Sequence, residues 1–290
     1  MHYKIVHKTA YTYSESVRLS PHILKLRSRS NAEQTLHRFQ LDIDPSPLGR
    51  SSCLDLDGNS LEKIWFGDRK LNRLEIITTS EVETHCRNPF NYILEPWAIS
   101  FPIDYPSSVL ARLSPYLNPR YLTSPIDPRV HQLALDIASA NHQKITPFLN
   151  ELNQQIYQNC QYQIRETGDP LPPGITWQHK QGTCRDFAVL FMEACRSLGL
   201  AARFVSGYQE GDRDSEETRY LHAWAEVYLP GAGWRGYDPT HGLATSDGHI
   251  PIAASALPEQ TTPISGHLRN SCVQSEMTFD LAIEVIDSEN

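Results

Sequence analysis

The sequence predicts an α+β protein, in which an N-terminal antiparallel β sandwich or barrel-like domain is followed by a core of helices packed on an antiparallel sheet. Three observations predict this fold class. Apolar residues alternate with a period of two in the first hundred residues, the period becomes helical after residue 128, and strand patterns return after residue 200. A length of 290 residues is enough for two such domains.

We therefore expect four consecutive segments. A β domain occupies residues 1–105, a proline-rich connector residues 106–128, a core domain residues 129–250, and a C-terminal extension with a closing strand residues 251–290. The connector belongs to a longer passage in which proline interrupts both helices and strand ladders. The prolines of that passage are Pro89, Pro96, Pro102, Pro106, Pro115, Pro119, Pro125 and Pro128.

Composition excludes several classes of protein. With 40% hydrophobic and 21% charged residues, the chain is too apolar for a disordered protein. No apolar run approaches the ~20 residues of a membrane span, and the first residues lack the apolar core of a signal peptide. The net charge is −8 and no basic run occurs, which argues against a nucleic-acid ligand. We expect a cytoplasmic protein that binds neither membrane nor nucleic acid.

The β elements are predicted from alternation and turn signals. Residues 3–13 alternate apolar and mainly polar side chains, and residues 39–43 do so again. Asp57-Gly58-Asn59 is a turn signal, and residues 74–82 are rich in Ile and Thr, as strands are. Residues 276–286 alternate once more and form the expected closing strand.

Helical periodicity begins at residue 130. Apolar residues at 130–138 and at 148–157 each fit one helical face. A third helix has both of its ends specified by sequence, because Thr183 is a suitable N-cap, Asp186 is placed as the acid of a capping box, and Gly199 is a natural residue after the C-cap. These signals predict a helix from residue 184 to residue 198.

Cys184 falls at the first position of this helix, where unpaired backbone N–H groups and the helix dipole favour a thiolate. Lowering the pKa of a thiol by ~3 units requires about 4 kcal/mol. A helix terminus supplies only ~0.3–1 kcal/mol, or about 2 kcal/mol where it is partly buried. A cationic imidazole beside the sulfur is therefore needed as well.

A predicted β-hairpin supplies that imidazole. Residues 222–229 alternate strictly, with His222 at the start of the strand, and residues 234–238 form the returning strand. Because the end of one strand lies beside the start of the other, Asp238 can face His222 and fix its tautomer. Cys184, His222 and Asp238 thus form a candidate nucleophile, base and orienting acid.

The motifs around these three residues resemble the bacterial branch of the transglutaminase-like superfamily. The N-terminal segment, Tyr3 to Tyr13 with Arg18-Leu-Ser-Pro-His22, is similar to the β domain that precedes the core in that branch. The resemblance implies a papain-like Cys-His-Asp core, with Cys184 as the nucleophile, His222 as the base and Asp238 as the orienting residue. The core motifs are Gly182-Thr-Cys-Arg-Asp-Phe187, Ala201-Ala-Arg-Phe-Val-Ser-Gly-Tyr208, His222-Ala-Trp-Ala-Glu-Val-Tyr228 and Gly233-Trp-Arg-Gly-Tyr-Asp-Pro-Thr240.

The activity implied is cysteine-dependent acyl transfer on an amide or peptide carbonyl, through a thioester on Cys184. Water as the acceptor gives a protease or amidase, and an amine gives a transglutaminase. We expect a peptide or protein substrate that is contacted by Thr183 and Trp224. The alternative for Trp224 is that it packs beside the site and does not contact the substrate. Relatives often carry Gly-Arg-Asp-Tyr where this chain has Ala254-Ser-Ala-Leu257, which affects substrate preference if that segment lines the cleft.

Two other interpretations remain open. The core can be a catalytically silent module that binds peptide or protein, or Cys184 and His222 can belong to a metal site, for which ligand number and spacing are poor. We expect no metal and no cofactor. The cysteines are expected to be reduced, since no export signal or paired spacing is present. They are Cys53, Cys86, Cys160, Cys184, Cys195 and Cys272.

Overall fold

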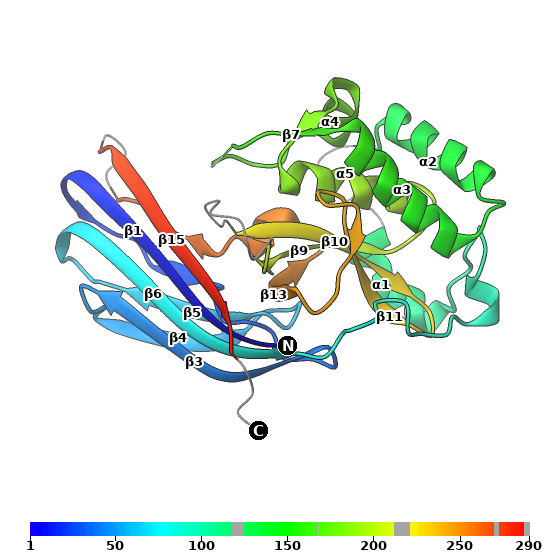
Figure 1. Ribbon diagram of the computed structural model, residues 1–290. Coiled ribbons are helices and arrows are strands. Elements are labelled where there is room, and N and C mark those ends of the chain that lie inside the picture. The colour runs from blue at the N-terminus through cyan, green and yellow to red at the C-terminus, as the bar shows by residue number, and fades with distance from the viewer. Residues whose placement is uncertain (118–124, 166, 212–220, 270–272, 287–290) are drawn as a thin grey trace.

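The computed structural model describes residues 1–117, 125–165, 167–211, 221–269 and 273–286 (Figure 1). It is an α+β protein built largely from antiparallel sheets, as the sequence predicts. Figure 1 shows a β unit on one side and a mixed unit with all the longer helices on the other. Cys272, which is expected to be a reduced cysteine, lies outside the described ranges, and so do residues 118–124 of the predicted connector.

The β unit consists of two four-stranded sheets. One has the order β15-β1-β6-β3, formed by β15 (Ser275–Val285), β1 (His2–Arg18), β6 (Lys70–Thr84) and β3 (Gln34–Asp44). The other has the order β14-β2-β5-β4, formed by β14 (Ile264–Ser265), β2 (His22–Leu24), β5 (Ser60–Trp65) and β4 (Gly49–Leu54). A cluster that includes Val17, Leu24, Ile64 and Leu74 fills the space between them. The unit is thus a sandwich whose two inner faces supply its core.

The mixed unit is a five-stranded antiparallel sheet with helices against one face. Its strands, in spatial order, are β12 (Leu243–Ala244), β11 (Gly233–Asp238), β10 (His222–Leu229), β9 (Ala202–Gln209) and β13 (His249–Ser255). The helices are α2 (Pro128–Ala140), α3 (Ile145–Asn159), α4 (Pro173–His179) and α5 (Cys184–Ser197). A short parallel pair, β7 (Gln161–Tyr162) and β8 (Gln181–Gly182), lies beside them.

Alternation along β10 explains how the sheet meets its helices. Ala223, Ala225, Val227 and Leu229 are buried in one cluster with Phe187, Leu190 and Phe191 of α5. This is the apolar face predicted for the strand. Because α5 lies across the same face, its N-terminal end is brought to the start of β10 (Figure 1).

The proline-rich passage contains a helix that the sequence analysis did not predict. α1 (Ser107–Leu117) includes Pro115 near its end, and η1 (Pro96–Ala98) is a short 3₁₀ turn. Leu113 of α1 is buried against Tyr105 and Ala201. This packing stabilises the helix, while Pro115 removes a single backbone donor. The expectation that proline density prevents a helix here is wrong.

The C-terminal segment joins both units. β13 pairs with β9 in the mixed unit, and the proposed boundary at residue 250 falls inside β13. After η3 (Pro258–Thr261), β14 pairs with β2 and β15 pairs with β1, so the predicted closing strand is confirmed. Among the residues that the structure describes, none of the helices has the length and hydropathy that a membrane span requires.

Candidate active site

The start of α5 is held by a fully buried carboxylate. Asp186 accepts hydrogen bonds from the backbone N–H of Thr183 at 2.7 Å and from its hydroxyl at 3.0 Å. The same carboxylate accepts from Arg165 at 2.6 Å and from the backbone N–H of Leu171 at 2.7 Å. The predicted capping box is confirmed, and Cys184 is the first residue of the helix. One acid thus fixes both the helix start and the loop before it.

The hairpin brings the candidate base and acid together. His222 is the first residue of β10 and Asp238 the last residue of β11, with Leu229 opposite Gly233 at the turn. The Nε2 atom of His222 lies 2.7 Å from Oδ2 of Asp238. His222 is 9% exposed and Asp238 is 0% exposed. The contact predicted from the two strand ends is confirmed.

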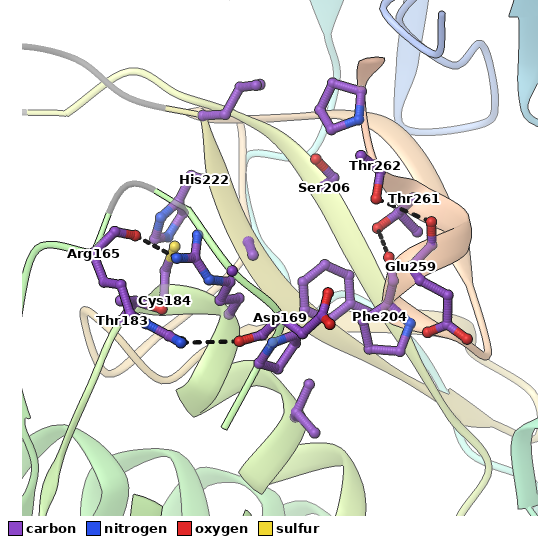
Figure 2. Close-up of a pocket in the computed structure, with 18 of the residues that line it drawn as sticks. Arg165, Asp169, Thr183, Cys184, Phe204, Ser206, His222, Glu259, Thr261 and Thr262 are labelled. Atoms are coloured by element: carbon purple, nitrogen blue, oxygen red, sulfur yellow. Dashed lines mark hydrogen bonds between the residues drawn. The ribbon is translucent and has the colours of Figure 1, made fainter. Parts of the chain in front are cut away.

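The other side of the His222 ring meets Cys184. Because Nε2 faces Asp238, Nδ1 is the ring nitrogen left for the sulfur, and the ring is hydrogen-bonded to the Cys184 side chain. Figure 2 shows the sulfur beside the His222 ring. Cys184 is 8% exposed, and it lines the same cavity as His222.

The electrostatics of this arrangement favour a charged imidazole. Burial alone lowers the pKa of His222, but the Asp238 carboxylate and the Cys184 sulfur outweigh it and raise that pKa from 6.5 to about 10. Burial alone raises the pKa of Asp238, yet the charge of His222 and hydrogen bonds from histidines hold it well below its usual range. The structure therefore supports an imidazolium between a carboxylate and a sulfur.

Asp238 is held by more partners than the sequence analysis proposed. Its Oδ2 atom also lies 2.9 Å from Nδ1 of His241 and 3.1 Å from Nε2 of His249. Its Oδ1 atom accepts from the backbone N–H of Thr240 at 3.0 Å. The sequence analysis proposed neither His241 nor His249 as a partner of Asp238. Three imidazoles and a backbone amide thus fix the orientation of one carboxylate.

The tautomer of His249 follows from its surroundings. Its Nδ1 atom accepts from the backbone N–H of Ser246 at 3.4 Å, so the proton is on Nε2 and is donated to Asp238. Burial lowers the pKa of His249, which keeps the ring neutral. Trp224 lies edge-on to the His249 ring, with centroids 5.4 Å apart. His249 is therefore a neutral donor whose ring is fixed by packing.

Ligating atoms of His222, Asp238 and His241 lie within 4.8 Å of one another, as in a metal site. Two ligands bound to zinc at about 2.0 Å with tetrahedral angles are separated by about 3.3 Å. The imidazole nitrogens are instead 2.7 and 2.9 Å from the same carboxylate oxygen, which are hydrogen-bond lengths. This geometry fits a hydrogen-bonded carboxylate better than a metal centre.

Cys184 and His222 open onto a cavity of about 890 Å³. Thr183 lines it next to Cys184, and Phe204 and Ser206 of β9 lie further along it (Figure 2). A volume of this size suits an extended ligand of several residues.

The two residues assigned to substrate binding have different positions. Thr183 lines the cavity. Trp224 is 1% exposed and packs with Val205 and Ala254 behind the sheet, so the structure does not bring it into the cavity. In the segment that departs from the family pattern, Leu257 lines the cavity.

The chain is similar to several known proteins. Residues 3–83 match the bacterial transglutaminase-like N-terminal region, and residues 131–239 match the transglutaminase-like superfamily. An uncharacterized protein of Mycobacterium bovis is 26% identical over 99% of this chain and 93% of its own length. A protein-glutamine gamma-glutamyltransferase of Pseudomonas aeruginosa is 27% identical over 41% of this chain and 19% of its own length.

A solved structure shares the whole fold. The crystal structure of a candidate cysteine protease from Cytophaga hutchinsonii aligns with a TM-score of 0.72 and 19% identity, covering 100% of this chain and 92% of that one. Cys184, His222 and Asp238 all lie inside the matched core region. From the two matched regions we conclude that the chain belongs to the transglutaminase-like superfamily and carries the N-terminal region of its bacterial members.

Proposed function

We propose that this protein catalyses acyl transfer from an amide or peptide carbonyl, as a cysteine protease, an amidase or a transglutaminase. One observation carries the proposal. The Cys184 sulfur, the His222 ring and the Asp238 carboxylate are in sequential contact, and Cys184 and His222 line a cavity large enough for a peptide. This is the arrangement of an activated thiol nucleophile, its base and the group that orients the base.

In the first half of the reaction, the Cys184 thiolate adds to the carbonyl carbon. The C–N bond then breaks, and the departing nitrogen takes the Nδ1 proton of His222, leaving a thioester on Cys184 and a neutral imidazole. Asp238 keeps the proton on Nε2 throughout, because that nitrogen lies 2.7 Å from its carboxylate. The raised pKa of His222, about 10, means that the proton is present at neutral pH.

The developing oxyanion requires donors next to the sulfur. The backbone N–H of Cys184 belongs to the first turn of α5, whose N–H groups have no partner within the helix. We assign this amide to the oxyanion site, where the helix dipole adds to the stabilisation.

In the second half, neutral His222 removes a proton from the incoming nucleophile, which attacks the thioester carbonyl. Water yields a carboxylic acid and an amine yields a new amide, and in both cases the Cys184 sulfur leaves as a thiolate beside the imidazolium. The same three residues serve both outcomes. The similarity to a gamma-glutamyltransferase and to a candidate cysteine protease supports this class of chemistry.

The test is detection of the acyl-enzyme. The full chain is incubated with a library of glutamine-containing peptides, quenched in acid and examined by intact mass, with and without an added primary amine. We expect a thioester on Cys184 whose level falls when the amine is added, and no adduct on a Cys184→Ala variant. Absence of any adduct and of any peptide product, with wild type and Cys184→Ala behaving alike, would contradict the proposal.

A further inference from the structure

One wall of the cavity comes from the N-terminal β unit. His7, Thr9 and Tyr11 of β1 line it, together with Leu281, Phe279 and Met277 of β15. The register pairs His7 with Leu281, Thr9 with Phe279 and Tyr11 with Met277. These are three consecutive cross-strand pairs on one face of the sheet, since side chains two residues apart point the same way. They form a continuous surface, which we call the β1–β15 wall.

The β1–β15 wall meets the mixed unit at one end. Ile5 and Ile283, the next pair along the two strands, are buried with Tyr208, Ile250 and other apolar residues of the core sheet. Leu281 is 8% exposed, whereas Met277, at the other end of the wall, is 39% exposed. From Leu281 toward Met277 the wall therefore diverges from the core sheet. The space between the wall and the sheet is the cavity that Cys184 lines.

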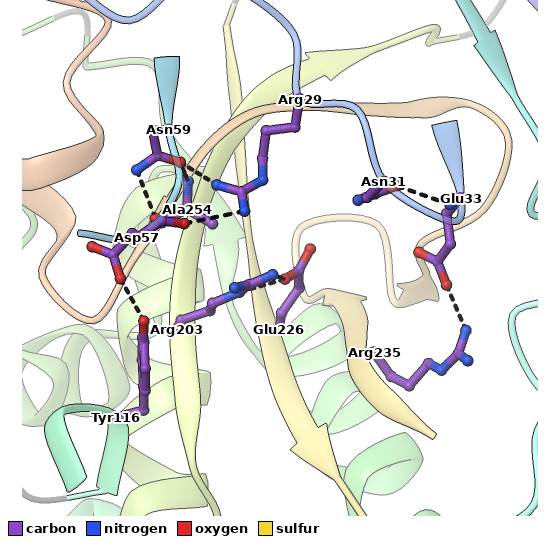
Figure 3. Close-up of polar contacts among 10 residues, drawn as sticks. All are labelled: Arg29, Asn31, Glu33, Asp57, Asn59, Tyr116, Arg203, Glu226, Arg235 and Ala254. Carbon is purple, nitrogen blue, oxygen red and sulfur yellow. Dashed lines mark hydrogen bonds and ion pairs between the residues drawn. The ribbon is translucent and has the colours of Figure 1, made fainter. Parts of the chain in front are cut away.

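The wall is fixed relative to Cys184 by polar contacts on the other side of the core sheet (Figure 3). Glu33 of the β unit pairs with Arg235 of β11. The buried Asn59 side chain donates to the carbonyl of Ala254 at 2.9 Å and accepts from its N–H at 2.8 Å. Asn59 thus completes the backbone hydrogen bonding of β13. These contacts join the two units, so the wall is a built part of the cavity.

Two polar side chains of the wall, those of His7 and Thr9, are hydrogen-bonded within the protein. Nδ1 of His7 lies 3.2 Å from the hydroxyl of Tyr208, and Nε2 lies 3.2 Å from the hydroxyl of Thr9. Burial lowers the pKa of His7 to about 4, so the ring carries no charge at neutral pH. The wall accordingly offers a ligand mainly the apolar parts of Tyr11, Met277 and Phe279.

The charged residues of the cavity do not favour an anionic or a cationic ligand. Each arginine guanidinium already donates to the protein: Arg165 to Asp186, and Arg185 and Arg196 to backbone carbonyls. Among the residues that line the cavity, the positive charges of three arginines equal in number the negative charges of three acids. They are Arg165, Arg185, Arg196, Asp169, Glu193 and Glu259.

From these observations we infer that the β1–β15 wall is a specificity site for an extended peptide that carries a large apolar or aromatic side chain near the scissile amide. This inference rests on the proposed function for its chemistry but on the wall for its specificity. From residue 7 to residue 11 the wall is about 13 Å long, which matches roughly four residues of extended chain. The β unit then forms one wall of the substrate site.

The test is direct peptide binding, measured on the full-length Cys184→Ala variant so that no turnover interferes. The probes are fluorescein-labelled hexapeptides of serine, glycine and one central glutamine, in which a single phenylalanine replaces each other position in turn. Fluorescence anisotropy gives the dissociation constants. We expect at least one phenylalanine peptide to bind about tenfold more tightly than the host peptide. The free energy of burying a phenylalanine side chain is large enough to lower a dissociation constant by about tenfold or more.

Three second-site substitutions in that background locate the preference. Met277→Glu places a charge on the β1–β15 wall and is expected to remove the tenfold advantage of phenylalanine. Thr278→Glu is the matched control, since Thr278 is exposed on the opposite face of the same strand, and it should leave the advantage intact. All three variants are checked for folding by circular dichroism. Met277→Leu keeps the wall apolar and should retain the preference for phenylalanine.

The inference is overturned if no phenylalanine peptide binds more tightly than the host peptide. It is also overturned if Met277→Glu and Thr278→Glu show the same preference for phenylalanine over the host peptide. Because this assay does not use the Cys184 sulfur, it is independent of whether a thioester forms. A phenylalanine preference without acyl-enzyme formation would contradict the proposed function alone, and a thioester without the preference would contradict this inference alone.

Discussion

The two ends of α5 place the same functional group in opposite environments. Cys184 begins the helix, lines the cavity and is hydrogen-bonded to His222. Cys195, eleven residues later on the same helix, is 0% exposed in the apolar core. Burial raises the pKa of Cys195 well above its usual value, and it lies next to Arg196, whose guanidinium donates to backbone carbonyls.

The difference shows that position and partner, not residue type, distinguish a candidate nucleophile from a packing residue. A helix start provides unpaired N–H groups, and the hairpin provides an imidazole whose charge is supported by Asp238. Neither is available at Cys195, in the last turn of the helix. The predictions below remove or alter these features one at a time.

The largest effect should follow from Asp238→Asn. Asparagine keeps the shape of the side chain but loses the negative charge and can turn an N–H toward Nε2 of His222, which favours the wrong tautomer. We expect turnover of an amide substrate to fall about 100-fold or more. Asp136→Asn, on the exposed surface of α2, is the matched control. If the Asp238→Asn protein is folded and its turnover lies within about threefold of the wild-type value, the role assigned to Asp238 is contradicted.

A second prediction uses pH. The pKa of His222 is raised from 6.5 to about 10, so the proton needed by the leaving amine is lost only as the pH rises through about 10. Amide turnover should then fall about tenfold per pH unit, whereas alkylation of Cys184, which needs no proton donor, should persist. Because the pKa of His222 is raised in the folded protein, its protonated ring also adds to the free energy of unfolding. This contribution is complete below pH 6.5 and is lost as the pH rises through about 10. A turnover midpoint near pH 6.5 on the alkaline side would refute this assignment.

A smaller effect is expected at His249. His249→Phe removes one hydrogen bond to Asp238, and we expect kcat/KM to fall about tenfold, consistent with roughly 1–1.5 kcal/mol for a buried hydrogen bond. His249→Gln keeps an N–H donor and should retain most of the activity. Melting temperatures of both variants separate this positioning role from a loss of fold. Equal activity in the two variants would show that the hydrogen bond has no part in positioning Asp238.

The smallest effect on chemistry should come from Cys195→Ser. The buried hydroxyl should lower the free energy of unfolding by about 1–3 kcal/mol, measured by urea denaturation. Turnover and alkylation of Cys184 should be unchanged in the folded protein. If Cys195→Ser abolished turnover while remaining folded, the contrast between the two cysteines would be wrong.

Much of this site is predictable because its signals are local. The cap at Thr183, the turn between β10 and β11 and the alternation along β10 each occupy a few neighbouring residues, and together they specify how Cys184, His222 and Asp238 approach one another. The helix α1 is less predictable, because the packing of Leu113 on residues distant in sequence outweighs the local effect of Pro115.

The remaining features depend on long-range pairing. His249 reaches Asp238 only because β13 pairs with β9, and no short motif marks that pairing. Trp224 shares a face of β10 with His222, but its side chain is buried against Val205 and Ala254 of the other strands of the sheet and does not line the cavity. The β1–β15 wall likewise requires the last strand of the chain to pair with the first.

The most direct test compares cysteines within one protein. Iodoacetamide labelling at pH 6, followed by peptide mapping, reports the rate at each thiol. Cys53 is exposed and so controls for accessibility, while Cys195 controls for burial. An ordinary thiol with a pKa of about 8.5 is less than about 1% thiolate at this pH. We predict that Cys184, although only 8% exposed, reacts at least about tenfold faster than Cys53, and that His222→Ala removes this advantage. Faster labelling of Cys53, or an equal rate in His222→Ala, would contradict the claim that an imidazolium activates the Cys184 sulfur.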